Sequence, residues 1–275
     1  MIAVTIAGSD SGGGAGIQAD LKTFGGMGVY GATVVTALTA QNTRGLTAQN
    51  TRGMIGIHDV PPEFITAQID AVFSDLKVGA VKIGMLSKTA TIEVVAEGLD
   101  RYKQTNVVLD PVMVASSGDR LLKPDAVETL RRLLFPRALI VTPNLPEAAA
   151  LLDTGIAGNE DEMRTQAERL LALGAKAVLI KGGHGTGNES VDLLVEPGAV
   201  TRLVAPRFVT RNTHGTGCTL SSAIAAGLAK GLPLTEAARA AKSYVTQAIA
   251  AADRLKVGSG DASSHGPVHH FYRWW

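Results

Sequence analysis

The residues best suited to chemistry lie in one short stretch, residues 212–219, which reads Asn-Thr-His-Gly-Thr-Gly-Cys-Thr. Its two glycines, Gly215 and Gly217, allow backbone N–H groups to converge in a tight turn, and the small and apolar residues after them predict a helix that opens there. Unpaired N–H groups and the helix dipole both attract negative charge, so the stretch predicts an anion-binding site. Cys218, the only cysteine, falls in the first turn of this helix, where we expect its thiol to ionise more readily than in water. Taken alone, the stretch fits a helix-capping loop with a buried structural cysteine equally well.

Composition narrows the class of protein around this site. The 275 residues are 45% hydrophobic and 19% charged, as in a globular protein with a full core. A formal net charge of +1 gives no electrostatic reason to expect a nucleic acid or an acidic partner. The single cysteine fits a reducing compartment, the N-terminus lacks the basic region of a signal peptide, and no apolar run approaches the roughly 20 residues that cross a membrane. We therefore expect a soluble, cytoplasmic protein with no membrane or nucleic-acid partner.

Short apolar, β-branched runs alternate with longer helical patterns along the chain. Predicted strands cover residues 2–7, 32–38, 80–84, 107–110, 138–142 and 177–181. Predicted helices cover residues 15–27, 62–74, 89–102, 124–134, 145–152, 160–173, 219–227 and 234 to about 256. A short antiparallel addition is expected at residues 191–195 and 202–204. This α/β pattern predicts a mostly parallel central sheet with helices on both faces, in a single domain over residues 1–275.

Polar and glycine residues follow the predicted strands at the points where those strands end. Ligands bind at the carboxyl ends of the strands in such sheets, so these residues are expected to share one site. In strand order, the residues that follow are 8–14, the Gln41-Asn42 pair, Met85, Asp110, Asn144 and Lys181.

One segment departs from this regular pattern, because residues 38–45 (Leu-Thr-Ala-Gln-Asn-Thr-Arg-Gly) are repeated without change as residues 46–53. Eight residues are too few for a solenoid repeat, so we interpret the copy as a local duplication in a loop or flap after the second strand. Eight is also an even number, so a strand that slides by one copy keeps each side chain on its face.

Two common nucleotide sites do not fit this chain. A P-loop needs a Gly-Lys pair, and the sequence contains none. Residues 14–19 match a dinucleotide-binding glycine pattern, but that site also needs an acidic residue about 20 positions on. No Asp or Glu lies between Lys22 and His58. The turn at residues 212–218 is left as the main candidate for a phosphate site.

The order of motifs resembles a known family along essentially the whole chain. The motifs are Ala-Gly-Ser-Asp (7–10), Gly-Gly-Ala-Gly-Ile-Gln-Ala-Asp (13–20), Ala-Gln-Asn (40–42), Lys-Ile-Gly-Met (82–85), Asp-Pro-Val-Met (110–113), Thr-Pro-Asn-Leu-Pro-Glu (142–147), Lys-Gly-Gly-His (181–184), residues 212–218 and His-Gly-Pro-Val-His-His-Phe (265–271). In this order they closely resemble the hydroxymethylpyrimidine/phosphomethylpyrimidine kinases of thiamine biosynthesis. The resemblance implies a three-layer α/β/α ribokinase-like fold and a homodimer. It also implies an enzyme that uses ATP and Mg²⁺ to phosphorylate 4-amino-5-hydroxymethyl-2-methylpyrimidine and then its monophosphate.

The resemblance also implies which residues handle the phosphates. The catalytic anion hole consists of Gly215, Thr216, Gly217 and Cys218, whose N–H groups stabilise charge on the transferring phosphoryl group. ATP is expected to be bound by Asp110, Asn144, Lys181 and Thr213. The metal is expected at Glu147 and Asp110, and Mg²⁺ retains several waters, so few protein ligands are needed.

For the pyrimidine, the resemblance implies contacts with Gly8, Ala15, Asp20, Gln41, Met85 and Val112. An amide such as that of Gln41 offers the donor and acceptor that an aminopyrimidine edge requires, while Met85 and Val112 suit a flat ring. Because of the duplication, Gln49 is the alternative to Gln41. We favour Gln41, since the strand is fixed from its upstream end.

The cysteine differs from the aspartate that sugar kinases of this superfamily place at the same position as general base. The first step deprotonates an alcohol, whereas the second uses a phosphate monoester that is already largely dianionic. We hypothesise that Cys218 acts as a base in the first step without repelling the second substrate. We expect no metal at His269 and His270, and we expect His184 and His214 to line phosphate loops. The alternatives are a pyridoxal kinase of the same fold and a non-catalytic nucleotide sensor.

Overall fold

A nine-stranded sheet forms the centre of the chain in a computed structural model, which describes residues 1–41, 54–113, 122, 124–183, 187–258 and 265–275. The strands lie in the order β3-β2-β1-β4-β5-β6-β7-β8-β9. Strands β2, β1, β4, β5, β6 and β7 pair in parallel, and the antiparallel pairs are β2 with β3, β7 with β8, and β8 with β9. The strands span β1 Ile2–Gly8, β2 Tyr30–Gln41, β3 Met54–Asp59, β4 Ala80–Ile83, β5 Val107–Leu109, β6 Ile140–Val141, β7 Val178–Lys181, β8 Glu189–Glu196 and β9 Ala199–Pro206.

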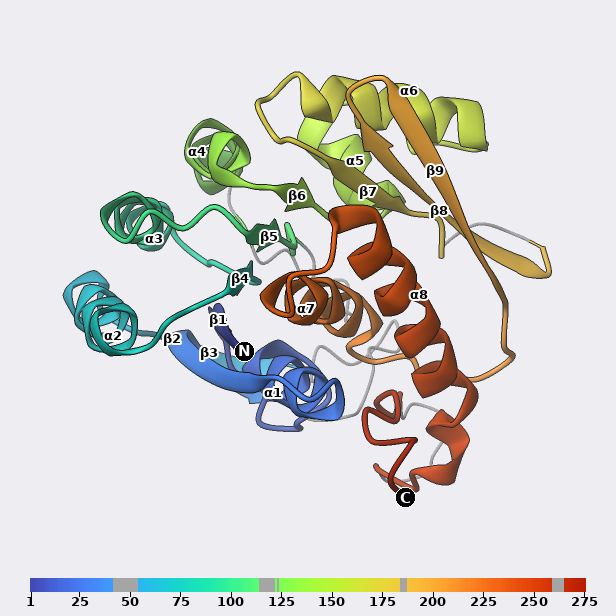
Figure 1. Ribbon diagram of the computed structural model, residues 1–275, viewed down its shortest axis with the longest axis horizontal. Coiled ribbons are helices and arrows are strands. Elements are labelled where there is room, and N and C mark those ends of the chain that lie inside the picture. Colours follow the sequence, from blue (N-terminus) through green and yellow to red (C-terminus); the bar gives the residue numbers. More distant parts are fainter. Residues whose placement is uncertain (42–53, 114–121, 123, 184–186, 259–264) are drawn as a thin grey trace.

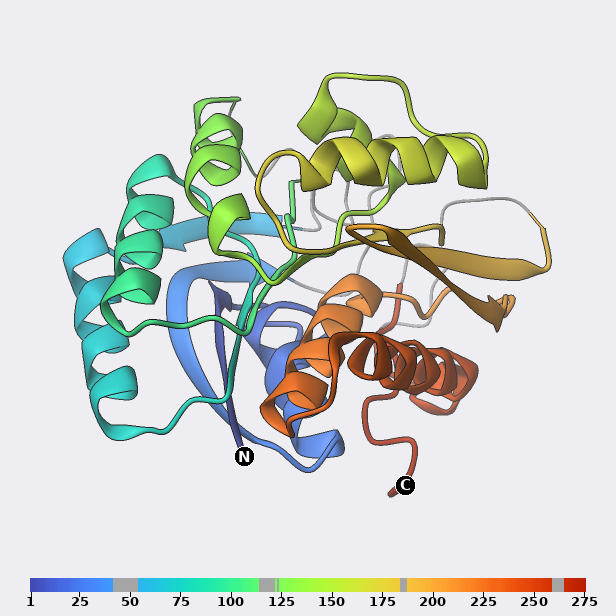
Figure 2. The same ribbon diagram turned by 45° about the horizontal axis from the view of Figure 1, so that its top comes forward.

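Helices cover both faces of the sheet, as Figures 1 and 2 show. The helices of one face are α2 (Pro62–Asp75), α3 (Thr89–Arg101), α4 (Pro124–Leu133), α5 (Leu145–Leu152) and α6 (Glu160–Leu171), and their buried apolar residues join one core cluster. Those of the other face are α1 (Gly16–Gly26), α7 (Thr216–Ala229) and α8 (Leu234–Ala250), which contribute to a second cluster. The predicted three-layer α/β/α architecture is therefore confirmed.

Helix α7 is the central helix of its layer, because α1 and α8 pack on either side of it (Figure 1). Its small residues permit this close packing: a side chain at Gly227 would place its Cβ 2.8 Å from Cβ of Ala237 in α8. Every residue from Thr219 to Leu228 is buried. The sequence therefore fixes α7 in the interior, with only its first turn facing the sheet edge.

The structure also corrects the predicted elements at three places. Strand β3 was not predicted, because it contains Gly56 and His58 and directly follows the duplicated segment. Strands β8 and β9 each span eight residues and are longer than expected, and α8 ends at Ala250 rather than near residue 256. Residues 42–53, with most of the duplication and Gln49, lie outside the described residues. Among the residues described, no helix is long and apolar enough to cross a membrane.

Candidate active site

The first turn of α7 meets the carboxyl ends of the parallel strands. Strands β1, β4, β5, β6 and β7 run in the same direction, so the residues that follow them gather at one edge of the sheet. A Cβ built on Gly217 would lie 3.2 Å from Nζ of Lys181, at the end of β7, and 3.8 Å from Oδ2 of Asp110, just after β5. The structure therefore brings together three of the residues predicted to handle phosphates.

The turn before α7 is held in a conformation that requires glycine. Gly215 has φ = 79°, and a Cβ at this position would lie 1.8 Å from the carbonyl oxygen of Gly14. Among the described residues, the N–H groups of Gly215, Gly217 and Cys218 have no acceptor, whereas Thr216 N–H donates to the carbonyl of Thr213 at 3.2 Å. The turn therefore offers three free N–H donors rather than the four predicted, because the Thr216 N–H forms a hydrogen bond within the turn.

A cluster of charged side chains faces this turn. Lys181 Nζ lies 2.9 Å from Asp110 Oδ1 and 3.8 Å from Glu147 Oε2. Thr142 and Ser221 donate hydrogen bonds to the two oxygens of Asp110, at 3.0 and 3.2 Å. Burial alone would raise the pKa of Asp110, but Lys181, Lys82 and the hydrogen bonds outweigh it and lower the pKa. Asp110 is therefore a firmly ionised group beside the α7 N-terminus.

Glu147 and Asn144 occupy the N-terminus of α5 as a capping box. The Asn144 side chain accepts from Glu147 N–H, and the Glu147 carboxylate accepts from Asn144 N–H, both at 2.8 Å. Burial raises the pKa of Glu147 to about 7; Lys181 opposes this rise and Asp110 adds to it. A cation beside Asp110 and Glu147 would stabilise the ionised form of Glu147 and lower its pKa again. The donor set, two carboxylates and an amide oxygen, consists of hard oxygen ligands that suit Mg²⁺.

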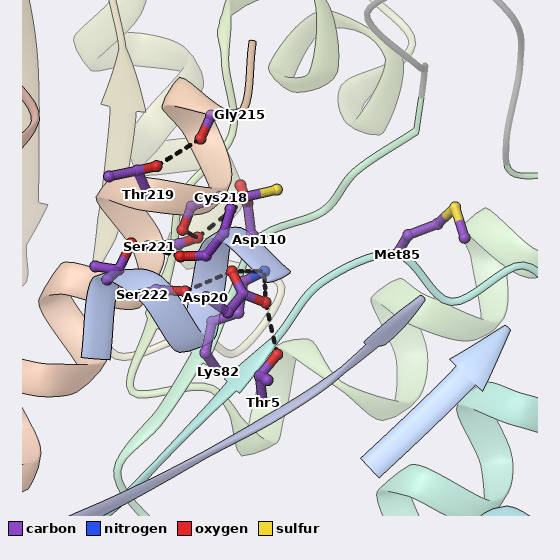
Figure 3. A network of polar contacts seen from close by, with 12 residues as sticks. Thr5, Asp20, Lys82, Met85, Asp110, Gly215, Cys218, Thr219, Ser221 and Ser222 are labelled. Atoms are coloured by element: carbon purple, nitrogen blue, oxygen red, sulfur yellow. Dashed lines mark hydrogen bonds and ion pairs between the residues drawn. The ribbon is translucent and has the colours of Figure 1, made fainter. Parts of the chain in front are cut away.

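A second buried charged pair lies beneath Cys218, as Figure 3 shows. Lys82, on β4, contacts both oxygens of Asp20 at 2.9 and 2.8 Å, and neither side chain is exposed. Thr5 and Ser222 donate to the same carboxylate, each at 2.6 Å. Burial alone would lower the pKa of Lys82, but the negative charges of Asp20 and Asp110 raise it, so Lys82 is a permanent cation.

This arrangement corrects two expectations. Asp20 does not lie at the surface of the site, because its carboxylate is fully buried and its oxygens are occupied by Lys82, Thr5 and Ser222. The expectation that the Cys218 thiol ionises easily is wrong as well. Burial raises the pKa of Cys218 to about 11, and the negative charges of Asp20 and Asp110 add to the rise, while Lys82 and the N–H of Gly16 only partly offset it.

The other predicted substrate residues lie around the end of β1. A Cβ on Gly8 would lie 2.6 Å from the Met85 methyl carbon, so these two residues are in contact. Ala15, the N-cap of α1, donates its N–H to Asp10 at 2.8 Å, and Val112 follows β5 and is half-buried. Gln41 is the last residue of β2 and pairs with Met54 of β3 after a register shift that follows Ala40. Thr213 is exposed and precedes the turn, and His184 lies outside the described residues.

Three further residues of the site were missed. Asp10 accepts N–H groups from Gly12, Gly14 and Ala15 and lies 2.9 Å from the ring of His214, so it ties the first glycine loop to the α7 turn. Lys82 carries the buried cation, and a lysine inside an apolar strand was the available signal. His270 contacts Thr219 of α7, across 51 residues of sequence that no local pattern spans.

Fold and site together define a ribokinase-like small-molecule kinase, whose candidate phosphate site is the N-terminus of a late helix rather than a P-loop. Comparison with known proteins gives the family, because the phosphomethylpyrimidine kinase model matches residues 10–269. The chain belongs to this phosphomethylpyrimidine kinase family.

Individual relatives agree with this assignment. A hydroxymethylpyrimidine/phosphomethylpyrimidine kinase of Rhizobium meliloti is 61% identical over 274 residues, which are 100% of this chain and 98% of that protein. A thiamine biosynthesis bifunctional protein of Geobacter sulfurreducens is 52% identical over 97% of this chain and 51% of its own length. The solved structure of Bacillus subtilis pyridoxal kinase with ADP has a TM-score of 0.86 and 36% identity, covering 99% of this chain and 98% of that one.

Proposed function

We propose that the protein transfers the γ-phosphoryl group of ATP to 4-amino-5-hydroxymethyl-2-methylpyrimidine and then to its monophosphate, which yields the diphosphate for thiamine biosynthesis. The observation that carries the proposal is the N-terminus of α7, where the N–H groups of Gly215, Gly217 and Cys218 have no acceptor among the described residues and Gly217 lies beside Lys181 and Asp110. Family membership and 61% identity to a named kinase of these pyrimidines support the substrate. Similarity to an ADP complex supports the nucleotide.

In this proposal the anion hole and Lys181 share the charge of the transferring phosphoryl group. N–H donors in a preorganised turn stabilise charge that develops in the transition state, and Lys181 adds a fixed positive charge. Burial alone would lower the pKa of Lys181, but Asp110 and Glu147 raise it, so the side chain stays charged. Glu147, Asp110 and Asn144 would hold Mg²⁺ and its waters, which supplies further positive charge to the phosphates. Thr213 would contact the nucleotide beside the turn.

The acceptor is expected to bind beside β1, against Gly8, Ala15, Met85 and Val112. Asp20 does not contact the pyrimidine ring in this proposal. It forms a buried ion pair with Lys82 below the site. Cys218 is the base for the alcohol of the first substrate. The second acceptor is a phosphate that needs no base. With the Cys218 pKa raised to about 11, only a small fraction is thiolate at neutral pH, so the first step is expected to be the pH-sensitive one.

Substrate choice is tested directly by a coupled assay of ADP release. Purified protein with ATP and Mg²⁺ is offered hydroxymethylpyrimidine, its monophosphate or pyridoxal at equal concentrations. We expect turnover of both pyrimidines and a kcat/KM for pyridoxal at least tenfold lower. A preference for pyridoxal would favour the rival kinase activity, and no turnover of any acceptor would favour a nucleotide sensor.

The duplicated segment requires its own test, since Gln41 and Gln49 occupy equivalent positions in the two copies. We predict that Gln41→Ala raises the KM for hydroxymethylpyrimidine by roughly tenfold or more, as expected when an amide that pairs with a ring edge is lost. The matched variant Gln49→Ala should leave the KM within about twofold of the parent. Steady-state kinetics on both variants measures this, and the opposite ranking would assign the contact to Gln49.

We also propose that the protein is a homodimer, as the family resemblance implies. Light scattering coupled to gel filtration measures the mass in solution directly. A mass near 57 kDa, about twice the 28.5 kDa of one chain, is expected. A single-chain mass at micromolar concentration would contradict this.

A further inference from the structure

The motif at residues 265–271 is not used by the proposed chemistry, yet it lies against the anion-hole turn. The described C-terminal residues, 265–275, lie beside α1 and α8 (Figure 1). The carbonyl of Gly266 accepts from His214 N–H at 3.1 Å, its N–H donates to the Asn212 side chain at 3.0 Å, and Val268 N–H donates to His214 at 3.4 Å. The segment thus forms an isolated parallel bridge, Pro267 with His214, just before the turn.

His270 extends this contact into α7 itself. Its Nε2 lies 3.0 Å from the hydroxyl oxygen of Thr219, and that hydroxyl lies 2.8 Å from the carbonyl oxygen of Gly215. Figure 3 shows the second of these contacts at the start of the helix. All three groups are buried. The Gly215 carbonyl therefore receives two hydrogen bonds, from the hydroxyl and from the N–H of Thr219, the latter also at 2.8 Å.

The direction of the hydrogen bonds follows from the number of protons. A hydroxyl has one proton, and a carbonyl can only accept, so the Thr219 proton points to Gly215. The hydroxyl oxygen must then accept from His270, which requires a proton on Nε2. Burial lowers the pKa of His270 to about 3, with Lys22 and His269 adding to the effect, so the ring is neutral and donates from one nitrogen.

The backbone of His270 is fixed as firmly as its ring. Its carbonyl accepts from the hydroxyl of Tyr244 in α8, and a Cβ on Gly26 at the end of α1 would lie 3.0 Å from the same carbonyl oxygen. His270 is therefore wedged between α1 and α8 with its ring aimed at α7. A side chain held this way can set the orientation of the group it contacts.

We propose that His270 is a positioning residue, which fixes the Gly215–Thr216 peptide through the Thr219 hydroxyl and so holds the next two N–H groups, of Gly217 and Cys218, toward the transferring phosphoryl group. The inference rests on the proposed kinase function. Both phosphorylation steps use the same γ-phosphoryl group, so His270 should serve both equally. This separates its role from that of Cys218, which is expected to matter chiefly in the first step.

The adjacent histidine provides a matched control. His269 is as buried as His270, with 2% and 4% exposure, but its ring packs on Trp275, and its Nδ1 has no hydrogen-bond partner among the described residues. We compare His270→Phe with His269→Phe, and Thr219→Val with Thr219→Ser. His270→Gln, which retains an N–H at a similar reach, is the conservative variant.

We expect His270→Phe and Thr219→Val to lower kcat about 10- to 100-fold for both pyrimidines, since misplaced catalytic groups cost this much, with the KM for ATP and pyrimidine changed less than threefold. His269→Phe and Thr219→Ser should keep kcat within about threefold of the parent, and His270→Gln should recover most of kcat. The double variant His270→Phe/Thr219→Val should have a kcat no lower than that of either single variant, because both changes break the same contact. Equal loss in His269→Phe and His270→Phe, or full kcat in Thr219→Val, would overturn the inference.

A loss of positioning can be distinguished from unfolding of a variant and from failure of the proposed function. Melting temperatures identify a variant that only unfolds, and the Thr219 pair decides the question if His270→Phe does not fold. Failure of the proposed function would appear in the parent protein, which would turn over neither pyrimidine. Failure of the inference would appear only in the variants of an active parent.

Discussion

Cys218 shows how burial can reverse what a local motif suggests. Its place in the first turn of α7 favours ionisation, yet the partly buried thiol lies among Asp20, Asp110 and Lys82, and its pKa is raised to about 11. The thiolate fraction should therefore grow about tenfold per pH unit over the range below that value. A base of this kind is weak at neutral pH, but it carries no negative charge to repel a phosphorylated acceptor.

We predict that Cys218→Ala lowers turnover of hydroxymethylpyrimidine at least about tenfold more than turnover of its monophosphate, since general-base contributions are of roughly 10²- to 10⁴-fold. In the parent protein the rate with hydroxymethylpyrimidine, divided by the rate with its monophosphate, should rise with pH from 7 to 9, because only the first step uses the thiolate. In Cys218→Ala the ratio should be flat. Rate profiles with each acceptor measure both effects, and equal losses in the two steps would contradict a role as base.

The buried pair of Lys82 and Asp20 makes a different prediction, about stability. Lys82→Met leaves the Asp20 carboxylate buried without its cation, which should lower the free energy of unfolding by about 3–5 kcal/mol. The double variant Lys82→Met/Asp20→Asn removes both charges and should recover a large part of that loss. Urea unfolding of the two variants measures the difference. A single variant as stable as the parent would show that the pair contributes nothing.

At the scale of elements, the site depends on connections between segments that are remote in sequence. Asp10 at the end of β1 accepts three N–H groups of the first glycine loop and also contacts His214 before α7. Burial alone would raise the pKa of Asp10, but the hydrogen bond and charge of His214 and the loop N–H groups outweigh it, so the pKa is lowered. One carboxylate therefore connects the first glycine loop to the turn before α7.

We predict that Asp10→Asn lowers the free energy of unfolding at pH 7 by about 1–3 kcal/mol and raises the KM for the pyrimidine more than the KM for ATP. Because the folded pKa of Asp10 lies below its unfolded value of about 3.9, the stabilisation is present above that value and is lost as the pH falls through the folded pKa. The gap between parent and variant should thus shrink as the pH falls below about 4. Asp100→Asn, which breaks an exposed ion pair with Arg137, is the control and should have little effect.

Sequence reasoning succeeded where the signal was local and failed where it was not. The six parallel strands and the glycine turn follow from apolar runs and from the spacing of Gly215 and Gly217. Strand β3 carries no alternating pattern, so it was not predicted. Its pairing with β2 is a tertiary contact that no local pattern indicates. The buried contacts of Asp20 depend on Lys82, Thr5 and Ser222, which come together only when β1, β4 and α7 pack. The raised pKa of Cys218 likewise depends on its burial and on Asp20 and Asp110, which are remote in sequence.

At the scale of the whole molecule, α7 joins the two halves of the site through successive hydroxyls. Thr219 bonds to the Gly215 carbonyl and contacts His270, Ser221 bonds to Asp110, and Ser222 bonds to Asp20. The buried Asp20 cluster, the Asp110 cluster and the C-terminal segment therefore meet on one helix. A ligand that neutralises the charge at its first turn should stabilise the entire fold rather than one loop.

This gives a prediction for ligand-dependent stability. A non-hydrolysable ATP analogue with Mg²⁺, at about 100 times its Kd, should add about 2.7 kcal/mol to the free energy of unfolding and raise the Tm by several degrees. Chelation of the metal should reduce the shift, because Asp110 and Glu147 would then face the phosphates without a cation between them. Glu147→Gln should lose the metal-dependent part of the shift and keep the remainder. Thermal unfolding with and without chelator measures both parts. An identical shift in the presence of chelator would show that these carboxylates do not hold the metal.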